Sequence, residues 1–196
     1  EPEQLTSAKP YRGQASVMLG SYGRLDQNVE AAVGDETKYA RLNANRSIAD
    51  SYQDGAGNTV PSDWEKWNAD LALGWTPNED TWVELKGGKS DGEAVYAGRP
   101  MDGSKFARES LGLHVEKKNI GDVIKKVEAQ VDYSYNDHVM DNLSLRKFNP
   151  ADGMSMPMAS NVARRTLNAR VAMTQDWGKL QLISGIDSQK NEHTKR

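Results

Sequence analysis

The sequence predicts an all-β fold, an antiparallel up-and-down meander of about nine strands. Segments with strict two-residue alternation run through the whole chain, and side chains two apart share one face of a strand. Almost no segment shows the period of an amphipathic helix. From the third strand onward the connections are alternately long and short, so all the long loops are expected at one end of the sheet.

Nine alternating segments support this prediction. The cleanest is 67–75, in which Trp67, Leu71 and Trp75 hold odd positions while Asn68 and Asp70 hold even ones. In chain order, the expected strands centre on residues 15–20, 28–33, 39–45, 67–75, 81–87, 110–116, 127–135, 166–174 and 180–187.

The connections between these segments differ in length. The long ones are expected at 46–66, 89–107 and 136–163, and the short ones at 76–80, 117–124 and 176–178. A soluble β-sandwich usually mixes turn lengths at both of its ends. Long loops at one end and tight turns at the other are typical of an outer-membrane β-barrel.

Aromatic residues are placed as a membrane interface requires. Trp75 and Trp177 lie at the short-turn ends of their strands, whereas Trp67, Tyr133 and Tyr135 lie at the long-loop ends on the apolar face. At about 3.3 Å per residue and a tilt of about 40°, the strand between Trp67 and Trp75 covers a height of roughly 20 Å, a little under the ~25 Å apolar band of such barrels. The alternative is a soluble all-β binding or adhesion domain whose tryptophans cover a core.

Composition excludes several other classes. The chain has 196 residues, 37% of them hydrophobic, with 25 basic and 28 acidic residues interspersed, so no nucleic-acid partner is indicated. The absence of cysteine excludes a disulfide scaffold, a thiolate zinc site and a cysteine nucleophile within these residues. No apolar run approaches the length of a transmembrane helix, but barrel strands give a far weaker hydropathy signal.

Both ends of the sequence suggest a fragment. No methionine precedes Glu1, and alternation is still running close to Arg196. Nine strands are too few for a large barrel, and open strand edges are not tolerated in hydrocarbon. We therefore expect further strands outside these residues.

The segment His138-Val139-Met140 places two metal-binding side chains two positions apart. If the strand at 127–135 continues through them, both point to the polar face with Glu128 and Asp132. An imidazole and a thioether suit copper, above all Cu(I), and suit magnesium or calcium poorly. The alternative is a polar histidine at the rim beside a space-filling methionine.

A second group of methionines follows in the next long loop. Met154, Met156 and Met158 alternate along the chain there. Thioethers suit Cu(I), so these residues are candidates for capturing copper at the mouth of a barrel. A flexible apolar patch packed against neighbouring loops is the alternative.

Several motifs resemble the barrel of TonB-dependent copper receptors of the bacterial outer membrane. They are Tyr133 to Asn142, Leu71 to Pro77, Lys89 to Ala94, Met101 to Phe106 and Arg108 to Leu113, while Pro10 to Gly13 resembles the passage from plug to barrel. The resemblance covers essentially the whole chain. It implies that residues 1–196 are part of a 22-stranded barrel domain, with the N-terminal plug and the C-terminal strands missing.

The resemblance also implies a copper site shared between two parts of one protein. A His-x-Met pair from the barrel, matched here by His138 and Met140, would meet a Cys-x-x-x-Met pair from the plug, which has no counterpart here. The implied partners are the copper ion, the plug, TonB through the missing N-terminus, and outer-membrane lipid. Transport by a monomer with no organic cofactor fits the same family pattern. No catalysis is assigned, because the charged residues of the polar faces suit a wall around a polar plug better than an acid/base pair; they are Glu30, Glu84, Glu128, Asp132, Arg41 and Arg170.

A different cargo is the main alternative within the same fold. A siderophore or other metal chelate is expected to use loop aromatics and arginines, for which Tyr96, Arg99 and Arg146 are candidates. His114 is expected on the inner wall against a plug, and His193 in solvent. The spacing of Asp91, Asp102, Asp137 and Asp141 fits no EF-hand loop, so solvation is favoured over calcium binding.

Overall fold

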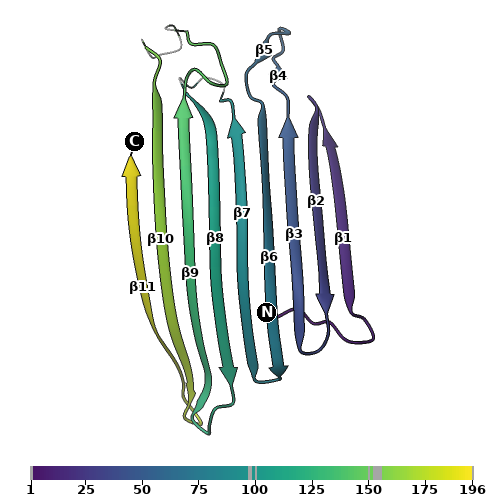
Figure 1. Cartoon of the computed structure of the whole chain (residues 1–196), viewed down its shortest axis with the longest axis vertical. Coiled ribbons are helices and arrows are strands. Elements are labelled where there is room, and N and C mark those ends of the chain that lie inside the picture. The colour runs from purple at the N-terminus through teal and green to yellow at the C-terminus, as the bar shows by residue number, and fades with distance from the viewer. Residues whose placement is uncertain (1, 97–98, 100, 150, 152–155, 196) are drawn as a thin grey trace.

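The fold is a single antiparallel sheet with one small hairpin beside it (Figure 1). The computed structural model describes residues 2–96, 99, 101–149, 151 and 156–195. Within these residues, the strands of the sheet follow one another in the order of the chain, as an up-and-down meander requires. They are β1 (Tyr11–Gly20), β2 (Arg24–Gly34), β3 (Lys38–Ala49), β6 (Trp64–Asn78), β7 (Thr81–Ala94), β8 (Asp102–Lys118), β9 (Ile124–Asp141), β10 (Ala159–Asp176) and β11 (Gln181–Lys195).

The nine predicted strands are all confirmed, but the predicted bounds of the long loops are wrong. Residues 89–94 and 102–107 are strand rather than loop, and β9 continues through residues 136–141. Polar residues interrupt the alternation in these stretches, so the pattern alone ended the strands too early. Pairing with neighbours on both sides holds the backbone extended there, as β9 shows between β8 and β10.

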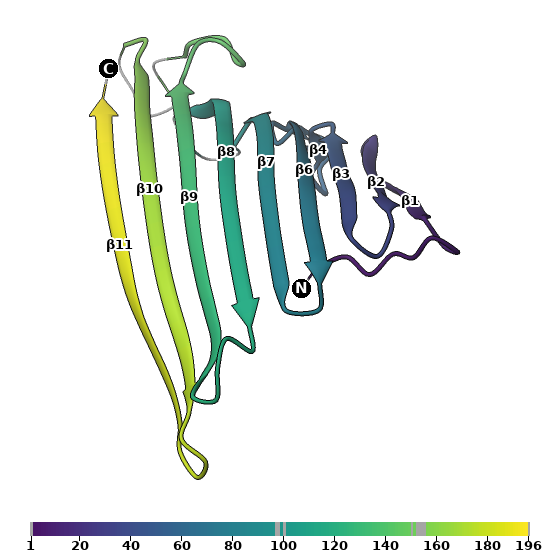
Figure 2. The same ribbon diagram turned by 60° about the horizontal axis from the view of Figure 1, so that its bottom comes forward.

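From β3 onward, long loops and tight turns lie at opposite ends of the sheet, whereas the short connection between β1 and β2 lies at the long-loop end (Figures 1 and 2). The tight turns join β2 to β3, β6 to β7, β8 to β9 and β10 to β11. In the first of them, Asp35 accepts hydrogen bonds from the backbone N–H of Thr37 at 2.8 Å and of Lys38 at 3.1 Å, and these bonds hold the pKa of Asp35 below its usual value. At the other end, the connection between β3 and β6 contains a hairpin of β4 (Tyr52–Gln53) and β5 (Thr59–Val60), which was not predicted.

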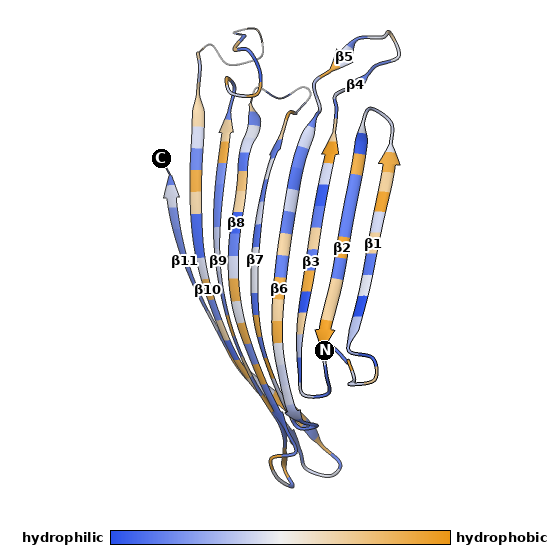
Figure 3. Cartoon of the chain, turned by 45° about the vertical axis from the view of Figure 1, so that its right-hand side comes forward, coloured by the Kyte–Doolittle hydropathy of each residue, from blue (hydrophilic) through white to orange (hydrophobic). Residues whose placement is uncertain are grey.

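The two faces of the sheet differ sharply in polarity. One face, here called the outer face, exposes apolar side chains such as Leu42, Leu71, Leu113 and Val131 to the surroundings. The opposite, inner face carries the charged residues, and Glu84 is only 2% exposed there. Bands of alternating hydropathy follow the strands in Figure 3. Apolar residues outside and charged residues inside reverse the order of a water-soluble domain and match a barrel wall in lipid.

The N-terminal segment reaches β1 from the inner side of the sheet. Leu5 is buried against Ala32 and Tyr39, both on the inner face. Glu3 forms ion pairs with Arg12 of β1 and, at 3.5 Å, with Arg41 of β3. The chain therefore passes along the inner wall before the first strand begins. Across the described ranges there is no helix long and apolar enough to cross a membrane.

Candidate metal-binding site at the inner rim

His138 and Met140 share the inner face of β9 near its loop end. His138 lies across from Phe106 of β8 and Val162 of β10, and Met140 lies across from Gly103 and Ser160. Paired residues share a face, and parity along β9 places both side chains with Glu128. The sequence-based prediction of a common polar face is confirmed. Both side chains are at least partly open to the space inside the curved sheet, His138 more so than Met140.

An aromatic ring covers one side of His138. The ring centroids of Phe106 and His138 are 4.5 Å apart, with 36° between their planes. Sequence reasoning missed this contact, although a signal was present. Counting in twos from Ser110 and Arg108 places Phe106 on the inner face, where an aromatic residue stands out among polar ones.

Hydrogen bonds hold the backbone of two methionines of the next loop beside the end of β9. Asn142, which is 4% exposed, accepts a hydrogen bond from the Met158 N–H at 2.8 Å and donates one to the Met156 carbonyl at 3.2 Å. Both methionine side chains are exposed. The third candidate, Met154, lies outside the described residues. The loop therefore presents two thioethers within three residues, next in sequence to β10.

A buried ion pair joins the two loops that flank the site. Arg146 donates to the carboxylate of Asp102, which is 0% exposed, and to the backbone carbonyls of Arg99 and Tyr96 at 3.0 Å. The guanidinium of Arg99 lies 5.2 Å from the centre of the Tyr96 ring. The three residues suggested for a chelate are thus brought together. Arg146, however, is engaged in holding the loops to each other.

A second cluster of potential ligands lies near the tight-turn end of the inner face. His114 Nε2 is 3.4 Å from Glu116 Oε2, and Glu128 completes a group whose ligand atoms lie within 4.8 Å of one another. Lys118 and Lys126 approach the other Glu116 oxygen at 3.7 and 3.5 Å. Lysines neutralise this carboxylate already, so the cluster is an ion-pair network on the wall. The prediction that His114 faces inward is confirmed by its pairing with Glu84.

Of the aspartates considered for calcium, only Asp102 and Asp141 lie directly across from each other, and each of the four carboxylates is engaged elsewhere. Asp102 binds Arg146, Asp137 Oδ2 lies 3.2 Å from Lys105, and Asp91 accepts from the adjacent Gly92 N–H. Asp141 accepts from the backbone and side chain of Ser144. Each carboxylate therefore has a local structural partner. His193 of β11 is exposed, as expected for a solvated residue.

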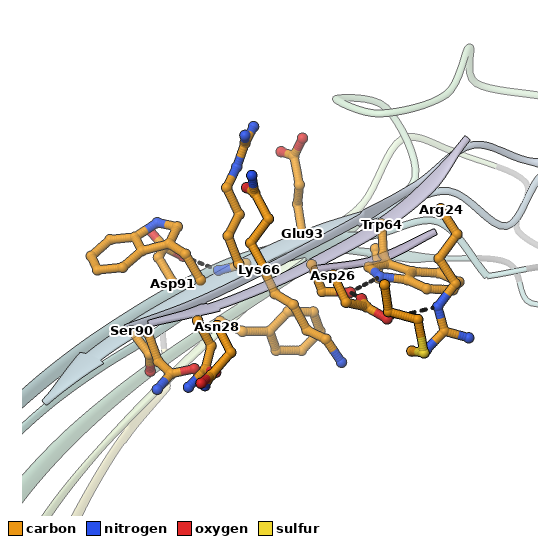
Figure 4. A pocket seen from close by; sticks show the side chains of 18 of the residues that line it. Arg24, Asp26, Asn28, Trp64, Lys66, Ser90, Asp91 and Glu93 are labelled. Atoms are coloured by element: carbon orange, nitrogen blue, oxygen red, sulfur yellow. Dashed lines mark hydrogen bonds and ion pairs between the residues drawn. The ribbon is translucent and has the colours of Figure 1, made fainter. Parts of the chain in front are cut away.

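An open hollow of about 1160 Å³ lies over the loop ends of β1, β2, β3, β6 and β7 (Figure 4). Trp64 donates from Nε1 to the Ser47 hydroxyl at 3.0 Å, Ser47 in turn donates to Asp26, and Arg24 pairs with Asp26 at 3.0 Å. The Arg24 guanidinium also lies 5.7 Å from the centre of the Trp64 ring. Phe106, whose ring contacts His138, also lines this hollow.

Solved structures of several transport proteins share this fold. A protein described as "Copper transporter OprC" is 54% identical with a TM-score of 0.94, and the match covers 100% of this chain and 31% of that one. The FrpB iron transporter from Neisseria meningitidis is 13% identical with a TM-score of 0.70, covering 95% of this chain and 29% of that one. A mutant of the ferric enterobactin receptor PfeA from Pseudomonas aeruginosa is 13% identical with a TM-score of 0.66, covering 97% and 32%. The latter two show the fold alone. No family model and no curated protein matches the chain.

Proposed function

We propose that this chain belongs to the TonB-dependent receptors of the bacterial outer membrane and forms part of the barrel wall of a copper uptake receptor. The proposal rests on one observation above all, the shared inner-face position of His138 and Met140 near the loop end of the barrel wall. Its support is the 54% identity to a copper transporter over the whole chain. The chain spans 31% of that transporter, so residues 1–196 are proposed as one part of a barrel domain that also has a plug and further strands.

The metal chemistry follows from the two side chains. A neutral imidazole and a thioether are borderline and soft ligands, which favours Cu(I) over magnesium or calcium. Two ligands leave a copper ion incompletely coordinated. We propose that the plug of the same protein supplies the remaining ligands, because this chain contains no cysteine. Copper is the transported cargo, and no organic cofactor or catalytic step is required.

The methionine loop supports a capture step ahead of the inner site. Met156 and Met158 are exposed and anchored through Asn142, and Met154 belongs to the same segment. We infer that these thioethers bind copper at the mouth and hand it to His138 and Met140. Release would follow when TonB, acting from the periplasm, displaces the plug and separates the two halves of the site. The energy then comes from that partner rather than from bond chemistry in the barrel.

The rest of the sheet fits a monomeric barrel. The edges of β1 and β11 present backbone groups that hydrocarbon leaves unpaired, so further strands of the same protein are proposed to pair with them. A 22-stranded barrel closed in this way needs no second subunit. The exposed apolar outer face would then contact lipid, which argues against the soluble adhesion domain.

The chelate alternative receives weaker support. Arg146 already binds Asp102 and two backbone carbonyls, so it is engaged in the loop structure and its side chain is 18% exposed. Uptake assays separate the two cargoes, because copper starvation should reveal a growth defect for a copper receptor and iron starvation for a siderophore receptor.

Substitution of the proposed ligands tests the function directly. We expect His138→Ala and Met140→Ala, made in the complete receptor, each to weaken anaerobic Cu(I) binding by at least about tenfold, and the double variant to remove tight binding. His114→Ala and Met173→Ala are matched controls, because His114 lies across from Gln130 towards the tight-turn end of the wall, and Met173 lies on the outer face. Tight stoichiometric Cu(I) binding that survives the double substitution would overturn the proposal.

A further inference from the structure

A bulge in β8 places Gly103 on the same inner face as Phe106, which lies beside His138. The pairing of β8 with β9 shifts between Gly103 and Lys105, so Ser104 has no partner of its own. Residues three apart normally face opposite sides of a strand, but one extra residue restores a common face. Gly103 and Phe106 therefore both face inward, the first across from Met140 and the second across from His138.

Because Gly103 has no side chain, the Phe106 ring can occupy the space above its backbone. A Cβ atom added at Gly103 would lie 2.1 Å from Cε2 and Cζ of the ring. No real side chain tolerates such a separation, so the ring lies over the glycine backbone. The ring thus extends from its stack on His138 towards the backbone position that pairs with Met140. The Phe106 ring therefore contacts His138 and lies over the residue that pairs with Met140.

We propose that Phe106, seated on Gly103, is a positioning residue for the copper site. This inference rests on the function proposed above. The stack with 4.5 Å between centroids restricts the orientation of the imidazole plane and shields one of its faces from water. A ligand that is already oriented loses less freedom when it binds the ion, and an apolar ring against one face of the imidazole limits the approach of water from that side. Phe106 itself donates no atom to the metal.

The inference distinguishes Phe106 from an ordinary packing residue. A packing residue would change the stability of the rim without a selective change in copper affinity. A positioning residue changes copper affinity only while His138 is present to be positioned. Planarity is the required property, so tyrosine should replace phenylalanine and leucine should not.

The test measures anaerobic Cu(I) affinity and thermal unfolding of the complete receptor in detergent. We expect Phe106→Leu to weaken Cu(I) binding by about 10- to 100-fold, the range seen when groups that orient metal ligands are removed. Phe106→Tyr should restore affinity to near that of the unchanged receptor. Phe148→Leu is the matched control, since it makes the same chemical change in the loop after β9 and should leave affinity unchanged.

A second variant disturbs the contact between Phe106 and His138 without changing the phenylalanine itself. Gly103→Ala adds the methyl group that the Phe106 ring excludes, so the ring must move and the affinity should fall as in Phe106→Leu. If Phe106→Leu does not fold, Gly103→Ala still tests the positioning role of Phe106. X-ray absorption at the copper edge should show a weakened imidazole contribution in either variant.

A double substitution separates the inference from the function on which it rests. In a His138→Ala background, Phe106→Leu should have no further effect on Cu(I) affinity. Equal losses with and without His138, or unchanged affinity in both Phe106→Leu and Gly103→Ala, would overturn the positioning role. Should His138→Ala alone leave affinity intact, the proposed copper site itself is wrong.

Discussion

Leu71 on the outer face of β6 offers the sharpest test of the membrane orientation. It lies midway between Trp67 and Trp75 on the same face, with 46% of its surface exposed. At about 3.3 Å per residue and a tilt of about 40°, each tryptophan is roughly 10 Å in height from Leu71. Leu71 therefore marks the middle of the apolar band, and an arginine there must bring its charge to the bilayer centre.

The expected cost of Leu71→Arg depends on the surroundings. In a bilayer the charge should destabilise the folded barrel by about 2–4 kcal/mol, whereas a girdle-level arginine costs about 0–1 kcal/mol. Val83→Arg is the depth control, because Val83 pairs with Trp75 on the same face. On a water-exposed surface Leu71→Arg should change stability by no more than about 0.5 kcal/mol.

Reversible denaturant unfolding of the complete receptor in lipid vesicles measures these differences. Leu71→Ala separates the loss of an apolar side chain from the gain of a charge. We expect the stability order to be unchanged protein, Val83→Arg and then Leu71→Arg, with a gap of at least about 1 kcal/mol between the two arginine variants. Equal stabilities of the two arginine variants would refute the assignment of the outer face to lipid.

Two further predictions concern the loop and turn ends. Asn142→Ala removes the two side-chain hydrogen bonds that hold Met156 and Met158, at about 1 kcal/mol each, so hydrogen exchange of the Met158 amide should quicken by about tenfold while that of the Gly178 turn amide stays constant. Unchanged exchange at Met158 would contradict this anchoring role. Because the pKa of Asp35 is lowered in the fold, its stabilisation of the turn is present above the ordinary aspartate pKa and is lost as pH falls through the lowered value. A carboxyl NMR titration checks this, and a midpoint at or above that of an unstructured aspartate would be inconsistent with it.

The sequence predicted the strands well where alternation is regular. Residues 67–75 and 127–135 lie within β6 and β9 with the predicted face outward, because period-2 patterning is a local property of one strand. It predicted the loop bounds poorly. Residues 136–141 carry mixed polarity, and only their pairing with β8 and β10 keeps them extended.

Some features of the candidate site were likewise predictable from the sequence and others were not. Parity along β9 was sufficient to place His138 and Met140 on one face, and the methionine run was visible in the loop. The loop-holding contacts of Asn142 and Arg146 gave no comparable signal, since their partners lie far away in the sequence at Met158 and Asp102. Such contacts depend on how two loops meet.

The sequence by itself determined the fold class, the outward apolar face and the common orientation of His138 and Met140. These properties follow from residues adjacent along one strand, where backbone geometry alternates side chains without reference to the rest of the chain. Only the tertiary structure decided that Phe106 stacks on His138 over Gly103. That contact depends on the register of β8 against β9 and on the bulge at Ser104, because one inserted residue changes which side chains share a face.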